Sequence, residues 1–489
     1  MLATVRLTIL AIFFAVANLK VAFADGPAPV PVAQAFASSS DGTYKLSEYK
    51  APVQGYGTPG CSIGNKWNLT VDDSPNGHKQ TIKGFGATVT DATVALFNAL
   101  PADTLQNLLN DLFNSSGAKY QMVRHTMGSS DMSPEPATSY DDTNDKTDSK
   151  IPHFNTSDRG VAMGELLDKM RLVQPELTIV GSPWSAPSWM KTPNNTFDPA
   201  YTQHLGTYFT KYLRAFWGGM GVKINAVTIQ NDPLSALPGL PRMSISAEEA
   251  VQLINNGIGP AIHEVGSQTA IWAYDGNTDN SDYPQTVVDG SSSYVKAVAW
   301  QCHAVLDNDW TALSDFHDKN KNYEQYMTNC WLKNDSAWSA ASDFTLGPLN
   351  NWASGVTAWT LATDTQNGPH LAGEGVCTAC VGLVMINPTA KTYELQTHHY
   401  MLAQFSKFIP RGASVLSSSL SSASSRSATG VDAVFAETPD GFRAVVIVNK
   451  NAQDVYITVE TRVAGEIWSG PVGKTSVVTW MLPPLGDLD

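Results

Sequence analysis

The stretch "YEQYMTNCW", Tyr323 to Trp331, has the pattern of a buried β-strand that ends in a short polar tip. Aromatic and apolar residues form most of its body, and Asn329 lies near its C-terminal end. In an α/β barrel the reacting groups lie at the C-terminal ends of the strands. Asn329 is therefore a candidate site residue, although an amide acts neither as a nucleophile nor as a base.

Seven further strand-like runs occur along the chain, and helical patterns or long loops separate them. They are TIKGFGATVTD (81–91), YQMVRHTMGSSD (120–131), LTIVGSPWSAPSWMK (177–191), INAVTIQNDP (224–233), AIWAYDGN (270–277), VKAVAWQCHA (295–304) and GVTAWTLATD (355–364). One of the helical patterns opens with Ser246 and Glu249 at capping-box spacing. Eight strands, each followed by a helix or long loop, predict an α/β fold of the (β/α)8 TIM-barrel type.

The pattern changes after Pro410 to a Ser-rich stretch (414–427) and then to runs of alternating apolar residues with Asp440-Gly441 as a hairpin turn. This pattern predicts an accessory antiparallel β-sandwich domain. The segment before the barrel has the same alternation, so we expect it to add a strand or two. The expected organisation is a signal peptide at 1–24, an N-terminal segment at 25–79 contributing strands to the β domain, the barrel at 80–408 and the β-sandwich at 409–489.

Residues 1–24 have the charged, apolar and small-residue zones of a secretory signal peptide, with cleavage expected after Ala24. No later apolar run reaches the roughly 18 residues that a membrane span needs. Five N-x-Ser/Thr acceptors agree with export to the extracellular space as a glycoprotein: Asn68, Asn114, Asn155, Asn194 and Asn334. The formal net charge of −14 argues against nucleic acid or an anionic membrane surface as the partner.

The chain has five cysteines, so at least one is unpaired if the others form disulfides. Cys377 and Cys380 form a C-x-x-C, which we interpret as a disulfide staple because no second ligand pair follows at zinc spacing. Cys302 and Cys330 end neighbouring strands and could pair, although a disulfide within a parallel sheet is geometrically awkward. The sequence has no P-loop, GxGxxG or HExxH, and we expect neither a metal nor a cofactor.

The tips of the eight strands are rich in Asp, Asn, Arg, Trp and His, which favours a pocket for a polar, ring-shaped ligand over ordinary polar loops. Other readings stay open for single residues. Arg124 suits a loop strut as well as a ligand contact, Trp184 and Trp359 suit the core as well as sugar platforms, and Trp189 suits the core better. His398 and His399 are more typical of structural histidines.

The same motifs resemble glycoside hydrolase family 30, the glucosylceramidase and fungal endo-β-1,6-glucanase group. "IKGFGATVTDA" is similar to its GFG-x-x-x-TDA, "VRHTMGSSDMS" to R-x-x-x-GSSD-x-S, "GSPWSAPSWMK" to SPW-S-x-P-x-WMK, "IQNDPL" to QNEP, "AWQCHA" to AWHCYA, "TNC" to TEC, "WTLATDTQNGPH" to WNLA-x-D-x-x-GPH, and "HHYMLAQFSKFIPRGA" to the segment before its β domain. The ordered matches run from about residue 80 to 415.

The resemblance implies retaining hydrolysis of β-glycosides, with β-1,6-glucan or a glucosylceramide-type glycolipid as the ligand. In the matching motifs, Asp232 occupies the position of the family's acid/base Glu, and Asn329 occupies the position of its nucleophilic Glu. Carried over in the same way, the substrate-binding positions are Asp91, Arg124, Asp131, Trp184, Asn231, Gln301, His303 and Trp359.

The chain departs from the family at both catalytic positions. Asp232 is one methylene shorter than Glu, and a misplacement of about an ångström can cost on the order of a hundredfold in rate. Asn329 provides no carboxylate to attack the anomeric carbon. Gln301 replaces a titratable ring, and Thr360 replaces an Asn. Two other carboxylates are candidates to replace the nucleophile. Glu324 lies about 16 Å from Asn329 along the strand, which is too far. Nothing in the sequence fixes Glu374 at the C-terminal end of the barrel, which we call the barrel mouth.

Three functions remain open from the sequence. The first is an active secreted β-glycosidase that works through Asp232 and a second group not yet identified. The second is a catalytically dead carbohydrate-binding pseudoenzyme. The third is a substrate-assisted route in which Asn329 orients the acetamido group of an N-acetylhexosaminide.

Overall fold

The computed structural model describes residues 32–55, 66–143, 146–235, 240–303, 310–422 and 430–485. The expected signal peptide and Cys61 lie outside these residues. The expected domain boundaries remain predictions, while the fold class is confirmed below.

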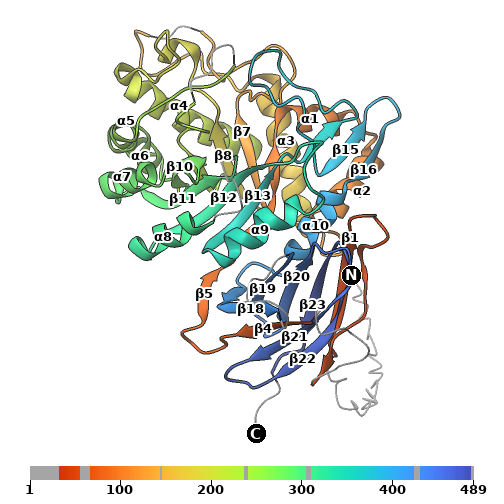
Figure 1. The fold of residues 1–489 in the computed structure, drawn as a ribbon. Helices are drawn as coiled ribbons and strands as arrows, with labels where there is room; N and C mark the ends of the chain where they lie inside the picture. Colours follow the sequence, from red (N-terminus) through yellow and green to blue (C-terminus); the bar gives the residue numbers. More distant parts are fainter. Residues whose placement is uncertain are drawn as a thin grey trace, which may run out of the picture. The chain divides into compact units, whose positions relative to one another are not determined.

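Eight parallel strands close into a barrel, in the spatial order β10-β11-β12-β13-β6-β7-β8-β9. Each corresponds to one of the eight runs in the sequence, and helices surround the barrel (Figure 1). The strands are β6 (Gly84–Val89), β7 (Met122–Met127), β8 (Thr178–Pro183), β9 (Ala226–Thr228), β10 (Ala270–Asn277), β11 (Val295–Gln301), β12 (Glu324–Trp331) and β13 (Ala353–Trp359).

The barrel strands are apolar along most of their length because both faces of a closed parallel sheet are covered. Every residue of β6, β7 and β13 is buried. Gly86 is needed where β6 approaches β7, since a Cβ at this position would lie 1.9 Å from the carbonyl oxygen of Met122.

Helices alternate with the strands, as the periodicity predicts. They are α1 (Asp91–Asn98), α2 (Ala102–Phe113), α3 (Ser157–Val173), α4 (Thr202–Arg214), α5 (Ala247–Leu253), α6 (Gly259–Glu264), α7 (Asp282–Ser291), α8 (Thr311–Lys319), α9 (Ala340–Asn350) and α10 (Thr397–Ser406), with short 3-10 or π-helical segments η2 (Ser188–Met190), η3 (Pro199–Tyr201), η4 (Ala215–Gly219) and η5 (Ile254–Ile258). The expected capping box is present at α5, where Ser246 and Glu249 exchange side-chain and backbone hydrogen bonds.

Two sheets form the accessory β domain, and strands from before and after the barrel contribute to both. The seven-stranded sheet has the order β2-β1-β23-β20-β19-β17-β5, and the five-stranded sheet has the order β18-β4-β21-β22-β3. Their bounds are β1 (Gln34–Ser39), β2 (Lys45–Glu48), β3 (Val53–Gln54), β4 (Lys66–Val71), β5 (His78–Thr81), β17 (Ser414–Leu416), β18 (Ser418–Ser422), β19 (Val431–Glu437), β20 (Arg443–Asn449), β21 (Val455–Thr461), β22 (Ile467–Val472) and β23 (Ser476–Leu482).

The β domain differs from the expectation in two details. The described residues before the barrel supply five short strands, more than the strand or two expected. The pair β4–β21 is parallel, whereas the other pairs of the two sheets are antiparallel. The predicted hairpin joins β19 to β20, and Gly441 has φ +81 in its turn, where glycine has no steric cost.

Helix α10 joins the barrel to the β domain, since it contacts β6 on one side and β1 and β23 on the other. Gln404 donates to Ser38 Oγ over 2.8 Å and accepts from Thr479 Oγ1 over 2.7 Å. His399 is buried in the same helix, where Nδ1 lies 3.1 Å from the Tyr120 hydroxyl. These contacts give His399 a structural role.

A small sheet that the sequence analysis did not predict follows the last barrel strand. It consists of β14 (Ala362–Asp364), β15 (Val384–Asn387) and β16 (Thr392–Leu395). Among the described residues, no helix has the length and apolar character that crossing a membrane requires.

Candidate functional site

A buried ion pair occupies the C-terminal end of the barrel. Arg124 on β7 and Asp275 on β10 have fully buried side chains, and Arg124 Nη2 lies 2.7 Å from Asp275 Oδ2. Arg124 Nε also donates to Ser182 Oγ over 3.1 Å. Two buried charges that hold each other in fixed geometry give the barrel mouth a rigid, electrically balanced base.

Asp275 collects hydrogen bonds from several strands. Its Oδ2 accepts from Ser182 (3.0 Å) and Thr228 (2.7 Å), and its Oδ1 accepts from Thr328 (2.5 Å). The backbone brings it there through a register shift between β10 and β11 at Tyr274/Gly276, with φ +74 at Tyr274 and +77 at Asp275. Such an irregularity re-aims a side chain, and it breaks the alternation from which inward residues are read in a sequence.

The side-chain oxygen of Asn231 is a second point of convergence. Arg124 Nη2 donates to it over 2.7 Å, Gln301 Nε2 over 2.9 Å and Asn329 Nδ2 over 3.4 Å. Gln301 and Asn329 are direct neighbours in the register of β11 and β12. Two of the four departures from the family pattern, Gln301 and Asn329, therefore contact the same amide, and each does so as a donor, which an ionised carboxylate is not.

Several polar atoms of this group are fully buried and have no hydrogen-bond partner among the described residues: Arg124 Nη1, Gln301 Oε1, Asn329 Oδ1 and Trp359 Nε1. The first three belong to the same terminal groups that meet at Asn231, so they lie within a few ångströms of one another. Two are donors and two are acceptors. Buried polar atoms normally have partners, so these four form an unusual set of unsatisfied donors and acceptors at the base of the mouth.

Two tryptophans lie beside the ion pair. The rings of Trp184 and Trp359 stack with centroids 5.1 Å apart, and the Arg124 guanidinium carbon lies 4.5 Å from the Trp184 ring centroid. Trp189 lies elsewhere, with Nε1 donating to Asp141 O over 3.1 Å and its ring packed against Tyr201. Trp184 and Trp359 are 3% and 1% exposed, so they form a buried layer that supports Arg124, and Trp189 belongs to the core at another place.

Asp232 follows β9 and Asn231 in a left-handed conformation with φ +48. Its backbone N–H donates to Asp275 O over 2.9 Å, and its carboxylate lies 3.8 Å from Arg242 Nη1. Its side chain is 27% exposed. Burial raises the pKa of Asp232, Arg242 opposes this, and Asp275 adds to it. A carboxyl group with a raised pKa is suited to give up a proton as a general acid.

Asp131 and the C-x-x-C define another side of the mouth. The Asp131 carboxylate accepts weakly from the Cys377 N–H over 3.4 Å, and burial raises its pKa. Cys377 and Cys380 form a disulfide, as do Cys302 and Cys330 at the ends of β11 and β12. The two disulfides thus tie segments next to Asp131 and next to Asn329.

His303 is not part of the hydrogen-bonded group around Asn231. Its ring centroid is 3.8 Å from that of Trp331, and its backbone N–H donates to Asn277 Oδ1 over 2.9 Å. Desolvation lowers the pKa of His303 well below its ordinary value, so the ring is neutral.

Asp91 has partners different from those of the other candidates. At the start of α1, its carboxylate accepts from Ser133 (3.1 Å) and Ser129 (3.3 Å) and lies 3.9 Å from Arg159. It lines a separate pocket of about 210 Å³ with Asn98 and other residues. Burial raises the pKa of Asp91 to about 6.

The shifted pKa of Asp91 predicts a pH dependence of stability. Between about pH 4 and 6 the folded protein holds a proton at Asp91 that the unfolded chain has lost, so the free energy of unfolding falls as pH rises through this range. Asp91→Asn removes the cost of the buried charge, and we expect it to gain about 2 kcal/mol over the natural protein at pH 7 but nothing at pH 4. Urea unfolding of both proteins at the two pH values measures this, and an equal difference at both would contradict it.

The sequence motifs indicate most of this group but not its centre. Asp275 stood out only as one polar strand tip, and Ser182, Thr228 and Thr328 were not singled out. Ser182 and Thr328 lie inside the motifs SPW and TNC, next to residues that were assigned. Within the described residues, no group of three or more His, Cys, Asp and Glu side chains has the arrangement of a metal site.

Comparison with known proteins agrees with the fold and the motifs. Residues 82–409 match the glycosyl hydrolase family 30 TIM-barrel domain. An endo-1,6-β-D-glucanase of Neurospora crassa is 51% identical over 464 residues, covering 93% of this chain and 95% of that protein. Mouse lysosomal acid glucosylceramidase is 25% identical over 426 residues, covering 80% of this chain and 79% of that protein.

A solved structure shares the architecture at low sequence identity. The structure described as an endo-β1,6-glucanase has a TM-score of 0.79 at 23% identity and covers 93% of this chain and 100% of its own. The match of the family domain spans the whole barrel, and the relatives match well beyond it. The chain belongs to glycosyl hydrolase family 30.

Proposed function

We propose that this protein binds β-1,6-glucan in the barrel mouth and does not hydrolyse it by the two-step retaining route. The observation that carries the proposal is the side chain of Asn329. It lies buried at the end of β12, and its Nδ2 is a donor to Asn231 at the position where the family motif has a carboxylate.

An amide at this position removes the first chemical step. A retaining glycosidase uses one carboxyl group as acid and a second as the nucleophile that forms the glycosyl-enzyme bond. Asn329 has no negative charge, so it neither attacks the anomeric carbon nor stabilises an oxocarbenium-like transition state. Asp232 remains as an acid without a partner nucleophile.

Other carboxylates near the mouth are unsuited to replace the nucleophile. Asp275 is fully buried and bonded to Arg124 and three hydroxyl groups. Asp131 is buried against the Cys377 N–H. Glu324 lies at the opposite end of β12, with Lys83 Nζ at 2.7 Å and the Tyr326 hydroxyl at 2.6 Å. Glu374 is exposed on its loop.

The features that support sugar binding do not depend on the missing carboxylate. The buried, unpartnered donors and acceptors of Arg124, Gln301, Asn329 and Trp359 suit the hydroxyl groups of a pyranose. The stacked Trp184 and Trp359 pack beside the Arg124 guanidinium, which keeps these polar groups in place at the base of the mouth. The name of the relative at 51% identity favours β-1,6-glucan over a glycolipid as the ligand.

We also propose that the protein is secreted and glycosylated. The expected signal peptide supports this. So does the exposure of four of the five acceptor asparagines, Asn68, Asn155, Asn194 and Asn334.

The test measures binding and turnover on the same sample. Calorimetry with β-1,6-linked gluco-oligosaccharides is expected to give saturable binding, while no new reducing ends form from them, from an aryl β-glucoside or from an aryl N-acetyl-β-hexosaminide. Turnover of a glucoside would contradict the loss of hydrolysis, and turnover of the hexosaminide alone would indicate the substrate-assisted route.

Trp359→Phe keeps the aromatic contact with Trp184 but lacks the indole N–H, so binding of the oligosaccharides, measured by the same calorimetry, should weaken about three- to tenfold.

A further inference from the structure

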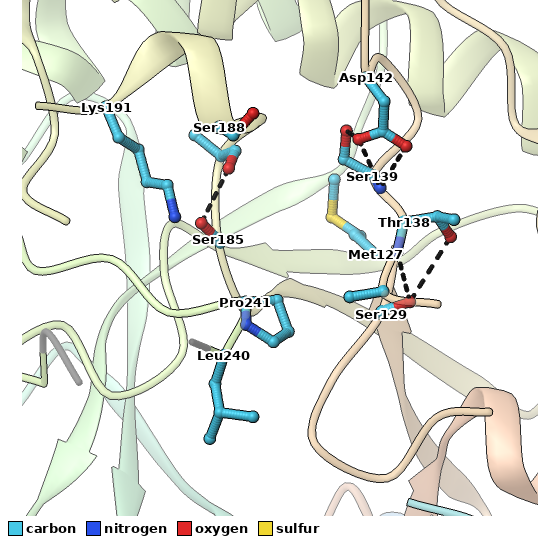
Figure 2. A pocket seen from close by; sticks show the side chains of 12 residues that line it. Met127, Ser129, Thr138, Ser139, Asp142, Ser185, Ser188, Lys191, Leu240 and Pro241 are labelled. Atoms are coloured by element: carbon cyan, nitrogen blue, oxygen red, sulfur yellow. Dashed lines mark hydrogen bonds between the residues drawn. The ribbon is translucent and has the colours of Figure 1, made fainter. Parts of the chain in front are cut away.

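A second pocket, of about 270 Å³, lies beside the mouth between the segments that follow β7 and β8. Figure 2 shows Ser185, Ser188 and Lys191 on one side of it and Ser129, Thr138 and Asp142 on the other. Leu240 and Pro241 lie between these two walls.

The lining has the composition of a sugar site. Hydroxyl groups predominate among its polar members, and Met127, Ala186, Leu240 and Pro241 supply apolar surface. The size lies just under the roughly 300 Å³ at which pockets for drug-sized molecules begin, so it suits a single small ring. Hydroxyls together with apolar patches match the alternation of O–H and C–H groups on a pyranose.

The charges of the pocket favour a neutral ligand. Lys191 Nζ donates to Arg242 O over 3.0 Å, which leaves two of its three N–H donors for another acceptor. Asp142 accepts from the Ser139 hydroxyl (2.7 Å) and backbone N–H (3.0 Å) and is exposed. One cation and one anion line the same space, so neither an anionic nor a cationic ligand gains a net attraction.

One residue links this pocket to the candidate acid. Lys191 Nζ and Ser185 Oγ both donate to the backbone oxygen of Arg242, over 3.0 and 3.4 Å. The guanidinium of Arg242 lies 3.8 Å from the Asp232 carboxylate. Ser185 also follows Trp184 directly in the chain. The pocket and the mouth therefore share a wall made of Trp184, Ser185 and Arg242.

We propose that this pocket is a second subsite, which holds a glucosyl unit of the same β-1,6-glucan chain that occupies the barrel mouth. The inference rests on the proposed function, and it adds the place where the glucan chain continues beyond the barrel mouth. A 1,6-linkage has an extra rotatable bond through C6, so successive units bend readily enough to enter a side pocket.

The test compares the affinity for the β-1,6-linked disaccharide with that for longer oligosaccharides, measured by calorimetry. In the natural protein the longer chains are expected to bind about tenfold more tightly, the effect of one or two added hydrogen bonds. Ser188→Trp fills the pocket from an exposed position, and Lys191→Met removes its free donors. Both variants should lose the gain with length and keep the disaccharide affinity.

A matched control places the same bulk in the other pocket. Ala95→Trp at the pocket beside Asp91 should keep both the disaccharide affinity and the gain with length. Thermal melting of each variant identifies a folding defect, and Lys191→Arg, which keeps a donor, should retain the gain. The subsite is refuted if the gain is absent in the natural protein or survives in both pocket variants. Failure of every oligosaccharide to bind would instead refute the proposed function.

Discussion

Asp275→Ala is expected to lower the free energy of unfolding by about 3–5 kcal/mol, because it leaves the fully buried Arg124 guanidinium without its counter-charge. The hydroxyl groups of Thr228 and Thr328 lose their acceptor as well. Chemical denaturation followed by tryptophan fluorescence measures the change. The effect is large because the missing partner is a charge removed from water, for which no solvent substitutes.

Two controls separate this mechanism from a general effect of alanine. In the double variant Arg124→Met/Asp275→Ala no charge remains unpaired, so it should be more stable than Asp275→Ala alone. Asp168→Ala breaks a partly exposed ion pair with Arg171 at 2.6 Å and should cost less than about 1 kcal/mol. A double variant less stable than the single one would show that the pair is not the source of the loss.

Asp232→Glu/Asn329→Glu is expected to gain hydrolysis of an aryl β-glucoside and of β-1,6-glucan. The second substitution supplies a carboxylate at the end of β12, and the first lengthens the acid by the methylene that the family residue has. Because a misplaced acid costs on the order of a hundredfold, Asn329→Glu alone should turn over about a hundredfold more slowly than the double variant.

The control for this gain is Asp232→Glu/Asn329→Gln. Gln has the length of Glu without its charge, so this variant should bind the glucan and should not hydrolyse it. If the natural protein turns over at a rate near that of the Glu/Glu variant, Asn329 is not at the nucleophile position. If the Glu/Glu variant folds and binds the glucan but does not hydrolyse it, the loss of activity extends beyond the two catalytic positions. Gln301, which stands where the family motif has His, is then the next residue to change.

The barrel was predictable from sequence because a parallel strand buried on both faces leaves an apolar run of characteristic length. The run predicted at 355–364, for example, overlaps β13, which is buried throughout its length. The small sheet β14–β16 was not predicted, because its strands are only three or four residues long. In addition, the side chains of β15 and β16 are partly exposed to solvent. A strand that short leaves too few alternations to distinguish it from a loop.

The site was predictable where a sequence motif identifies the residue and not where only the folded backbone brings the residue into the group. Asn231, Asn329 and Arg124 lie together, as their motifs suggest, although Asn231 follows the end of β9 and Asn329 lies at a register shift of β12. Asp275 follows a residue of positive φ at a register shift, so its inward direction is invisible to a pattern of period two. Its pairing with Arg124 also joins residues 151 positions apart, which only the closed barrel brings into contact.

The three donors on Asn231 have a consequence for the evolution of this protein. A retaining active site keeps carboxylates close together in a poorly hydrated space, where their repulsion lowers stability in exchange for rate. Here position 329 has an amide instead of a carboxylate, and it donates, together with Gln301, to the side-chain oxygen of Asn231. A carboxylate placed at position 329 would forfeit the Nδ2 donor to Asn231, so recovery of the nucleophile of the family carries a cost to the hydrogen bonding at the base of the barrel mouth.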